Sequence, residues 1–173
     1  MESGNSINNI RNSQKEVSLI YDLVVCGGGL AGVSAALAAS RLGLKTALIQ
    51  DRAVLGGNSS SEIRVPLAGA ANGNPWAREG GIIEELTLTE RFNNFTFRFE
   101  SMINDVWDLV LYDKCYQEKN LTLYLNSSIR SVKLDAKKLS AVFASQLGSE
   151  CELEIQGKMF VDASGDGTIA YLA

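Results

Sequence analysis

The chain of 173 residues contains no histidine, and this absence narrows the chemistry that its own side chains can supply. Histidine is the commonest metal ligand and the commonest general base, so we expect no metal site. A catalytic base within this chain would have to be Glu, Asp, Lys, Tyr or Cys. Nothing in the sequence singles one of these out, and no catalytic residue is assigned.

Cysteine is also scarce, and its three copies are far apart: Cys26, Cys115 and Cys151. Because no Cys-x-x-Cys pair occurs, neither a redox dithiol nor a zinc knuckle is indicated. Unpaired thiols of this kind are typical of a reducing compartment. We therefore expect a cytoplasmic protein.

The sequence lacks both a cluster of positive charge and a long apolar run. The net charge is −4 and no block of Lys or Arg occurs, which argues against nucleic acid as a partner. No apolar segment reaches the about 20 residues of a transmembrane helix, so we expect no membrane partner either. Residues 1–19 are mostly polar, lack the apolar core of a secretory signal, and are predicted to form a disordered tail.

A β-α-β unit is predicted directly after this tail. The apolar run 20–26 is typical of a strand buried on both faces, and the alanine-rich segment 30–42 is typical of a slim helix. A second apolar run, 44–50, follows at once. The short connection through a helix predicts that the two strands are parallel.

The remainder predicts an α/β fold with a small antiparallel addition. Residues 51–81 read as a long loop, and loops of this length are usually functional. Two amphipathic patterns predict helices, and period-two alternation predicts strands separated by turns. The expected helices are 78–91 and 102–119, and the expected strands are 121–125, 128–134, 139–145, 151–155 and 158–163.

A glycine-rich turn of the form Gly-x-Gly-x-x-Gly joins the first strand to the first helix. Gly27 would allow the tight bend, Gly29 the close approach of a pyrophosphate, and Gly32 the close packing of the helix. Leu30 and Ala31 would open a helix whose N-terminus directs N–H groups at the phosphates. The alternative is an ordinary glycine turn that binds no nucleotide.

The residue expected to hold a ribose is unusual. Dinucleotide sites place an acidic residue about 20 positions beyond the glycine turn. Here Gln50 ends the second strand, with Asp51 beside it. A glutamine still forms hydrogen bonds with a ribose diol, but without the added strength of a charged acceptor.

Three motifs together resemble a known superfamily. The glycine turn, Arg52-x-x-x-Gly56-Gly57 and the run Val-Asp-Ala-Ser-Gly-Asp-Gly at 161–167 are similar to the FAD-dependent oxidoreductases of the glutathione-reductase-like superfamily. The resemblance covers residues 20–173. It implies a Rossmann-like FAD/NAD(P)-binding domain, a parallel sheet with an appended antiparallel β-meander, and FAD as the cofactor. It implies no particular substrate.

The resemblance also implies cofactor-binding residues beyond the glycine turn. They come from the long loop, from the first meander strand and from the end of the last strand. The set is Arg52, Gly56 and Gly57 toward the adenosine or pyrophosphate, Asn58, Ser59 and Ser60 along the ribitol, Ile129 at the adenine edge, and Ser164, Gly165 and Asp166 near the ribitol or pyrophosphate.

Members of this superfamily continue past the last of these motifs into a substrate domain. We therefore expect this chain to be the FAD-binding portion of a longer oxidoreductase, to be inactive alone, and to self-associate through surface that the missing domain would cover. The alternatives are a flavoprotein with a modifying or hydratase-like role, a non-catalytic dinucleotide-binding or interaction domain, and an NAD-only Rossmann domain. The motif at 52–57 and the meander argue against the last.

Overall fold

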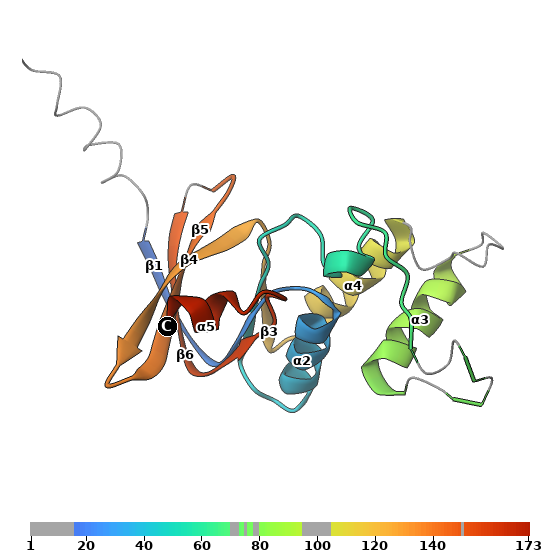
Figure 1. The fold of residues 1–173 in the computed structure, drawn as a ribbon, viewed down its shortest axis with the longest axis horizontal. Coiled ribbons are helices and arrows are strands. Elements are labelled where there is room, and N and C mark those ends of the chain that lie inside the picture. The colour runs from blue at the N-terminus through green and yellow to red at the C-terminus, as the bar shows by residue number, and fades with distance from the viewer. Residues whose placement is uncertain (1–15, 70–72, 75, 78–79, 95–104, 150) are drawn as a thin grey trace, which may run out of the picture.

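The computed structural model describes residues 16–69, 73–74, 76–77, 80–94, 105–149 and 151–173. Its centre is a six-stranded mixed sheet with the strand order β3-β2-β1-β6-β5-β4. Figure 1 shows α2, α3 and α4 toward one end of the molecule, and β4, β5 and α5 toward the other. The strands are β1 Glu16–Cys26, β2 Thr46–Ile49, β3 Leu121–Tyr124, β4 Ser127–Asp135, β5 Lys138–Gln146 and β6 Cys151–Asp162.

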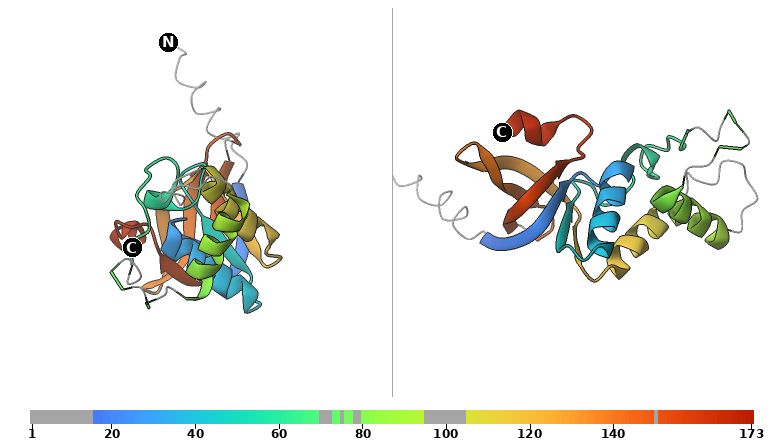
Figure 2. Two further views of the ribbon diagram at one scale, coloured as in Figure 1. Left: turned by 90° about the vertical axis from the view of Figure 1, so that its right-hand side faces the viewer. Right: turned by 90° about the horizontal axis from the view of Figure 1, so that it is seen from below.

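The helices largely follow the predicted pattern. They are α2 Leu30–Arg41, α3 Gly81–Asn93, α4 Asp105–Gln117 and α5 Thr168–Leu172, with a 3-10 turn η1 at Gly57–Ser59. The short helix α5, which the sequence did not predict, lies beside β4 and β6 (Figure 2). Residues 78–79 and 102–104, where two helices were expected to begin, lie outside the described residues. No helix of the described part has the length and apolarity needed to cross a membrane.

The parallel strands bring three chain segments to one edge of the sheet. β1 pairs in parallel with β2 and with β6, and Cys26 is opposite both Ile49 and Asp162. All three strands therefore end at the same level. Ligand sites of open α/β sheets lie outside the carboxyl ends of the strands.

The segment after the second turn of the meander forms one strand instead of the predicted two. β6 runs without a break from Cys151 to Asp162, antiparallel to β5 over its first half and parallel to β1 throughout. Gly157, which interrupts the apolar alternation, is a point of close approach, because an added Cβ would lie 2.7 Å from the Val24 side chain. The pairing with β6 also extends β1 back to Glu16, so residues 16–19 of the predicted tail are strand. Residues 1–15 lie outside the described part.

Both faces of the parallel strands are buried, as the apolar runs predicted. On one face, Val33 and Leu37 of α2 pack with Val25 and Leu48, together with Trp107 of α4. The other face is covered by the meander and α5, whose buried side chains include Val142, Ile155 and Ile169. The sheet edge that carries the loops is thus supported from both sides.

Candidate functional site

A cavity of about 730 Å³ opens at the carboxyl ends of β1, β2 and β6. Its walls come from the glycine turn, the end of β2, the loop around η1, the start of β4 and the turn after β6. Among its lining residues are Gly27, Gly29, Leu30, Ala31, Gln50, Asp51, Arg52, Gly56, Gly57, Asn58, Ser59, Ile129, Ser164, Gly165 and Asp166. The fold therefore gathers most of the predicted cofactor residues around one cavity.

Two glycines of the turn are required by packing within the protein. Gly27 has a φ of +109°, and a Cβ there would lie 2.3 Å from the carbonyl oxygen of Ala163. A Cβ on Gly32 would lie 1.8 Å from the carbonyl oxygen of Gly27. The turn is thus pressed between the end of β6 and its own helix. Gly32 does not itself line the cavity.

Gly29 has no such explanation within the protein. Its φ of −65° and ψ of 176° are extended values that any residue adopts, and a Cβ there would meet no atom within 4 Å. Gly29 is also the residue before α2, and no side chain among the described residues caps this helix start. An open space beside uncapped N–H groups is the geometry that accepts a phosphate. The structure thus leaves an open space beside Gly29, the position at which the sequence predicts the pyrophosphate.

Gln50, the predicted ribose contact, lines the cavity and also bonds to the glycine turn. Its Oε1 accepts a hydrogen bond from the Gly28 N–H at 2.8 Å, and its Nε2 donates to the carbonyl of Val54 at 3.1 Å. The residue is only 4% exposed. Both ends of the amide are thus used to connect the glycine turn to the following loop, and Gly28 is a turn residue that the sequence reasoning did not single out.

The exposed residues after Gln50 carry the charge of the cavity. Asp51 and Arg52 lie at its edge, and Arg52 Nη1 is 3.3 Å from Glu62 Oε2. Both of these side chains are more than a third exposed, so the ion pair contributes little to stability and leaves the guanidinium available to solvent.

The loop around η1 approaches the glycine turn through its backbone. The Gly56 N–H donates to the Gly28 carbonyl at 2.8 Å, and Asn58 is exposed at the cavity. Ser59 is buried, and its hydroxyl donates to the Gly56 carbonyl at 2.9 Å. Ser60 is fully buried and does not line the cavity, unlike the expectation of a ribitol contact.

The start of β4 reaches the cavity because it is joined to the end of β2. Ser127 N–H donates to the Gln50 carbonyl at 2.8 Å, and Asn126 N–H donates to the Arg52 carbonyl at 3.1 Å. This places Ile129 on the lining. Two serines that the sequence reasoning missed, Ser127 and Ser128, line it as well.

Asp162, which was not predicted to be important, organises the turn after β6. Its Oδ1 accepts from the N–H and the hydroxyl of Ser164, and its Oδ2 accepts from the N–H groups of Ile169 and Ala170. The Ser164 hydroxyl also accepts from the Thr168 N–H at 2.9 Å. Ser164 is therefore engaged within the turn. Gly165 and Asp166 are exposed beside the cavity.

These contacts keep Asp162 ionised. Desolvation is the largest single influence and raises the pKa of Asp162, but the hydrogen bonds from Ser164, Ala170 and Ile169 together outweigh it. The pKa of the carboxyl therefore lies below its usual value.

Several further lining residues were not among the predicted cofactor-binding residues. They lie at the ends of β1, β2 and β6, in residues 65–68 of the long loop, and at the start of α5. They are Cys26, Ile49, Val65, Pro66, Leu67, Ala68, Ala163, Thr168 and Ile169. Each is a neighbour in space of a predicted residue, and only the folded arrangement identifies it.

The sequence of the described domain matches an established family. Residues 22–173 fit the family model of the FAD dependent oxidoreductases. The chain belongs to this family. FAD is accordingly its cofactor.

Solved structures share the fold of this FAD dependent oxidoreductase. L-proline dehydrogenase from P. horikoshii is similar at 22% identity and a TM-score of 0.52, over 87% of this chain and 24% of that one. A geranylgeranyl bacteriochlorophyll reductase-like protein from Thermoplasma acidophilum is similar at 15% identity and a TM-score of 0.58, over 90% of this chain and 42% of that one. The myxobacterial FAD-dependent halogenase CndH is similar at 17% identity and a TM-score of 0.57, over 84% of this chain and 37% of that one. This chain spans less than half the length of each.

Proposed function

We propose that this chain forms the FAD-binding part of a larger oxidoreductase and that its 730 Å³ cavity holds the cofactor. The observation that carries the proposal is Gly29, where neither backbone strain nor packing accounts for a glycine beside an uncapped helix. Bound FAD supplies the two-electron redox chemistry, and the protein supplies position and electrostatics. The substrate and the electron acceptor are not assigned.

The cavity walls suggest a direction for the cofactor. The glycine turn and the start of α2 would hold the pyrophosphate through N–H groups. Arg52 and the strand start at Ser127–Ile129 would hold the adenosine end. Asn58 and the exposed turn at Gly165–Asp166 also line the cavity, and they would lie along the ribitol, as the resemblance of the motifs implies.

The same proposal includes a reducing compartment such as the cytoplasm. Cys26, Cys115 and Cys151 are all free in the structure, and the first two are buried. Free thiols are typical of proteins that work where thiols stay reduced.

The test is the variant Gly29→Val. The Cβ of the new side chain would meet no protein atom within 4 Å, so stability to urea should stay close to the wild-type value. FAD affinity, measured by flavin fluorescence titration, should fall by at least about tenfold, which is roughly 1.4 kcal/mol of binding. Ser131→Val, on the exposed part of β4, is the matched control and should bind FAD normally.

Two results would contradict the proposal. Wild-type chain that binds no FAD, or binds NAD⁺ in its place when both are offered, would exclude the cofactor assignment. A Gly29→Val variant with wild-type FAD affinity would exclude the glycine turn as the pyrophosphate site.

A further inference from the structure

The first turn of α4 is bonded to the loop that forms one wall of the cavity. We call residues Gly56–Ser61 the cofactor loop. Trp107 Nε1 donates to the Ser59 hydroxyl at 3.1 Å, and that hydroxyl in turn donates within the loop to Gly56. The next residue, Asp108, accepts from the Ser61 N–H at 3.0 Å and from the Ser61 hydroxyl. Consecutive residues of α4 thus hold the middle and the end of the cofactor loop.

The beginning of the cofactor loop also rests on α4. Leu111 lies one turn beyond Trp107, and its Cδ1 would be 2.9 Å from a Cβ placed on Gly56. Gly56 has a φ of +107°, which other residues rarely adopt. Because Trp107 and Leu111 are both fully buried, the loop sits on a closely packed surface.

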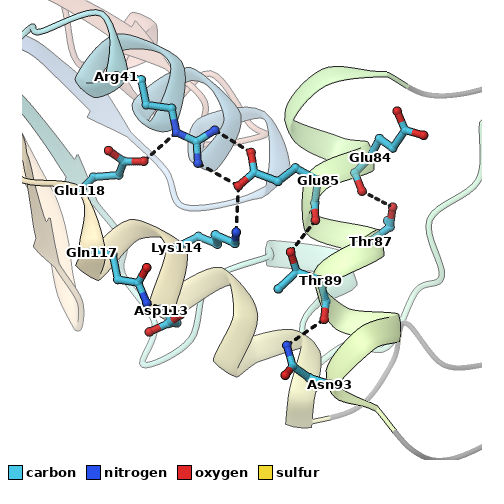
Figure 3. A network of polar contacts seen from close by, with 10 residues as sticks. All are labelled: Arg41, Glu84, Glu85, Thr87, Thr89, Asn93, Asp113, Lys114, Gln117 and Glu118. Carbon is cyan, nitrogen blue, oxygen red and sulfur yellow. Dashed lines mark hydrogen bonds and ion pairs between the residues drawn. The ribbon is translucent and has the colours of Figure 1, made fainter.

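The other end of α4 is fixed to α2. Figure 3 shows the Arg41 guanidinium between Glu85 of α3 and Glu118, at 2.7 and 2.6 Å, with Lys114 of α4 at 2.9 Å from Glu85. Arg41 is the last residue of α2, and the first residues of α2 line the cavity. The helix α4 is therefore held between two walls of the same site.

We propose that Trp107 and Asp108 are positioning residues that set the affinity for FAD, an inference that rests on the proposed function. Neither residue lines the cavity, so each acts through the serine it contacts, Ser59 or Ser61. A loop that is already ordered loses little conformational entropy when a ligand binds. A loop released from α4 must be ordered at the moment of binding, and affinity falls.

Substitutions of Asp108 separate an effect on FAD affinity from an effect on the stability of the fold. Asp108→Ala removes the acceptor for both hydrogen bonds from Ser61. Because hydrogen bonds to a charged group are the stronger ones, their loss should lower FAD affinity roughly tenfold or more. Asp108→Asn keeps one acceptor oxygen for the Ser61 N–H and should recover part of the loss. Asp113→Ala is the matched control, because this carboxylate on the same helix is exposed and accepts from Gln117 of α4.

The experiment combines FAD titration with amide hydrogen exchange of the ligand-free full chain. In Asp108→Ala, the amides of the cofactor loop should exchange faster and FAD should bind more weakly, while Asp113→Ala should match the wild type in both. Trp107→Phe, which keeps an aromatic ring but removes the N–H donor, should change both measurements in the same direction to a smaller extent.

The outcomes distinguish this inference from the proposed function. If Asp108→Ala lowers the urea midpoint but leaves FAD affinity and loop exchange unchanged, the contact is structural only and the inference is wrong. If the wild type binds no FAD, the proposed function and the affinity role fail together. Hydrogen exchange on the ligand-free chain then still decides whether α4 orders the loop.

Discussion

Two glycine-rich segments face the cavity from neighbouring walls, and different forces hold them in place. The turn Gly27–Gly32 is fixed by backbone atoms, since missing side chains let it press against the end of β6 and against its own helix. The cofactor loop is fixed by side chains of α4, about fifty residues later in the chain. The two segments touch through the Gly56 N–H and the Gly28 carbonyl.

This difference has a physical consequence. Close packing of backbone on backbone leaves no room for adjustment, so a single added carbon in the turn is costly. Hydrogen bonds from a distant helix can be weakened one at a time. The turn should therefore behave as a fixed element of the fold, whereas the cofactor loop should be adjustable without unfolding the domain.

The largest effect should come from Gly32→Ala. The new Cβ would lie 1.8 Å from the Gly27 carbonyl oxygen and 3.3 Å from the Ala163 Cβ. We expect a loss of about 3 kcal/mol in the free energy of unfolding, measured with urea. Gly29→Ala, at an open position three residues away, is the control and should unfold like the wild type. Equal midpoints for the two variants would show that the turn is not rigid.

The next effect should come from Gln50→Leu, which removes the side chain that joins the glycine turn to Val54, just before the cofactor loop. The buried Gly28 N–H would lose its acceptor and the Val54 carbonyl its donor. An unsatisfied buried group costs about 2 kcal/mol in unfolding free energy. Exchange of the Gly28 amide should also speed up. Gln117→Leu, at an exposed amide on α4, is the matched control, and a protected Gly28 amide in Gln50→Leu would contradict the role given to Gln50.

A smaller and pH-dependent effect should come from Glu85→Gln, on the side of the molecule that supports the cofactor loop. The hydrogen bond from Arg41 is the main cause that lowers the pKa of Glu85 from 4.5 to about 2. A carboxyl whose pKa is lowered by folding stabilises the fold at pH values above its pKa in the unfolded chain. This contribution is lost as the pH falls from about 4.5 toward 2.

The side chains of this pair are about one-third exposed, so solvent screening limits the cost of Glu85→Gln at neutral pH to about 1 kcal/mol. The difference from the wild type, measured by urea unfolding across this pH range, should shrink toward zero in acid. Glu62→Gln, in the more exposed pair with Arg52, is the control. A difference that persists at low pH would show that the Arg41 contacts do not depend on the Glu85 charge.

The last prediction compares the reactivity of the thiol beside the glycine turn with that of the thiol on α4. Burial raises the pKa of Cys26, just before the glycine turn, and of Cys115, on α4, to about 12. Cys151 is partly exposed. A thiol-specific disulfide reagent at neutral pH should therefore modify Cys151 quickly and the other two only after unfolding. The variant Cys151→Ser should show no fast reaction, and a fast reaction of Cys115 would indicate that α4 opens in the folded chain.

The sequence predicted the glycine turn because this feature is local, whereas the resemblance implied the other predicted cofactor residues. An apolar run that ends in Gly-x-Gly-x-x-Gly and continues as an alanine-rich helix fixes its own geometry within about fifteen residues. Parallel pairing then brings the strand ends together. The prediction was incomplete for β6, because pairing with both β1 and β5 carries the strand through Gly157.

The sequence by itself determined the fold class, the FAD family and the place of the glycine turn, since each depends on patterns within short segments and on the order of those segments along the chain. Only the tertiary structure decided that Gln50 supports the turn, that Asp162 organises the turn after β6, and that Trp107 and Asp108 hold the cofactor loop. These roles arise from contacts between side chains and distant backbone groups. Spacing along the chain does not encode such contacts.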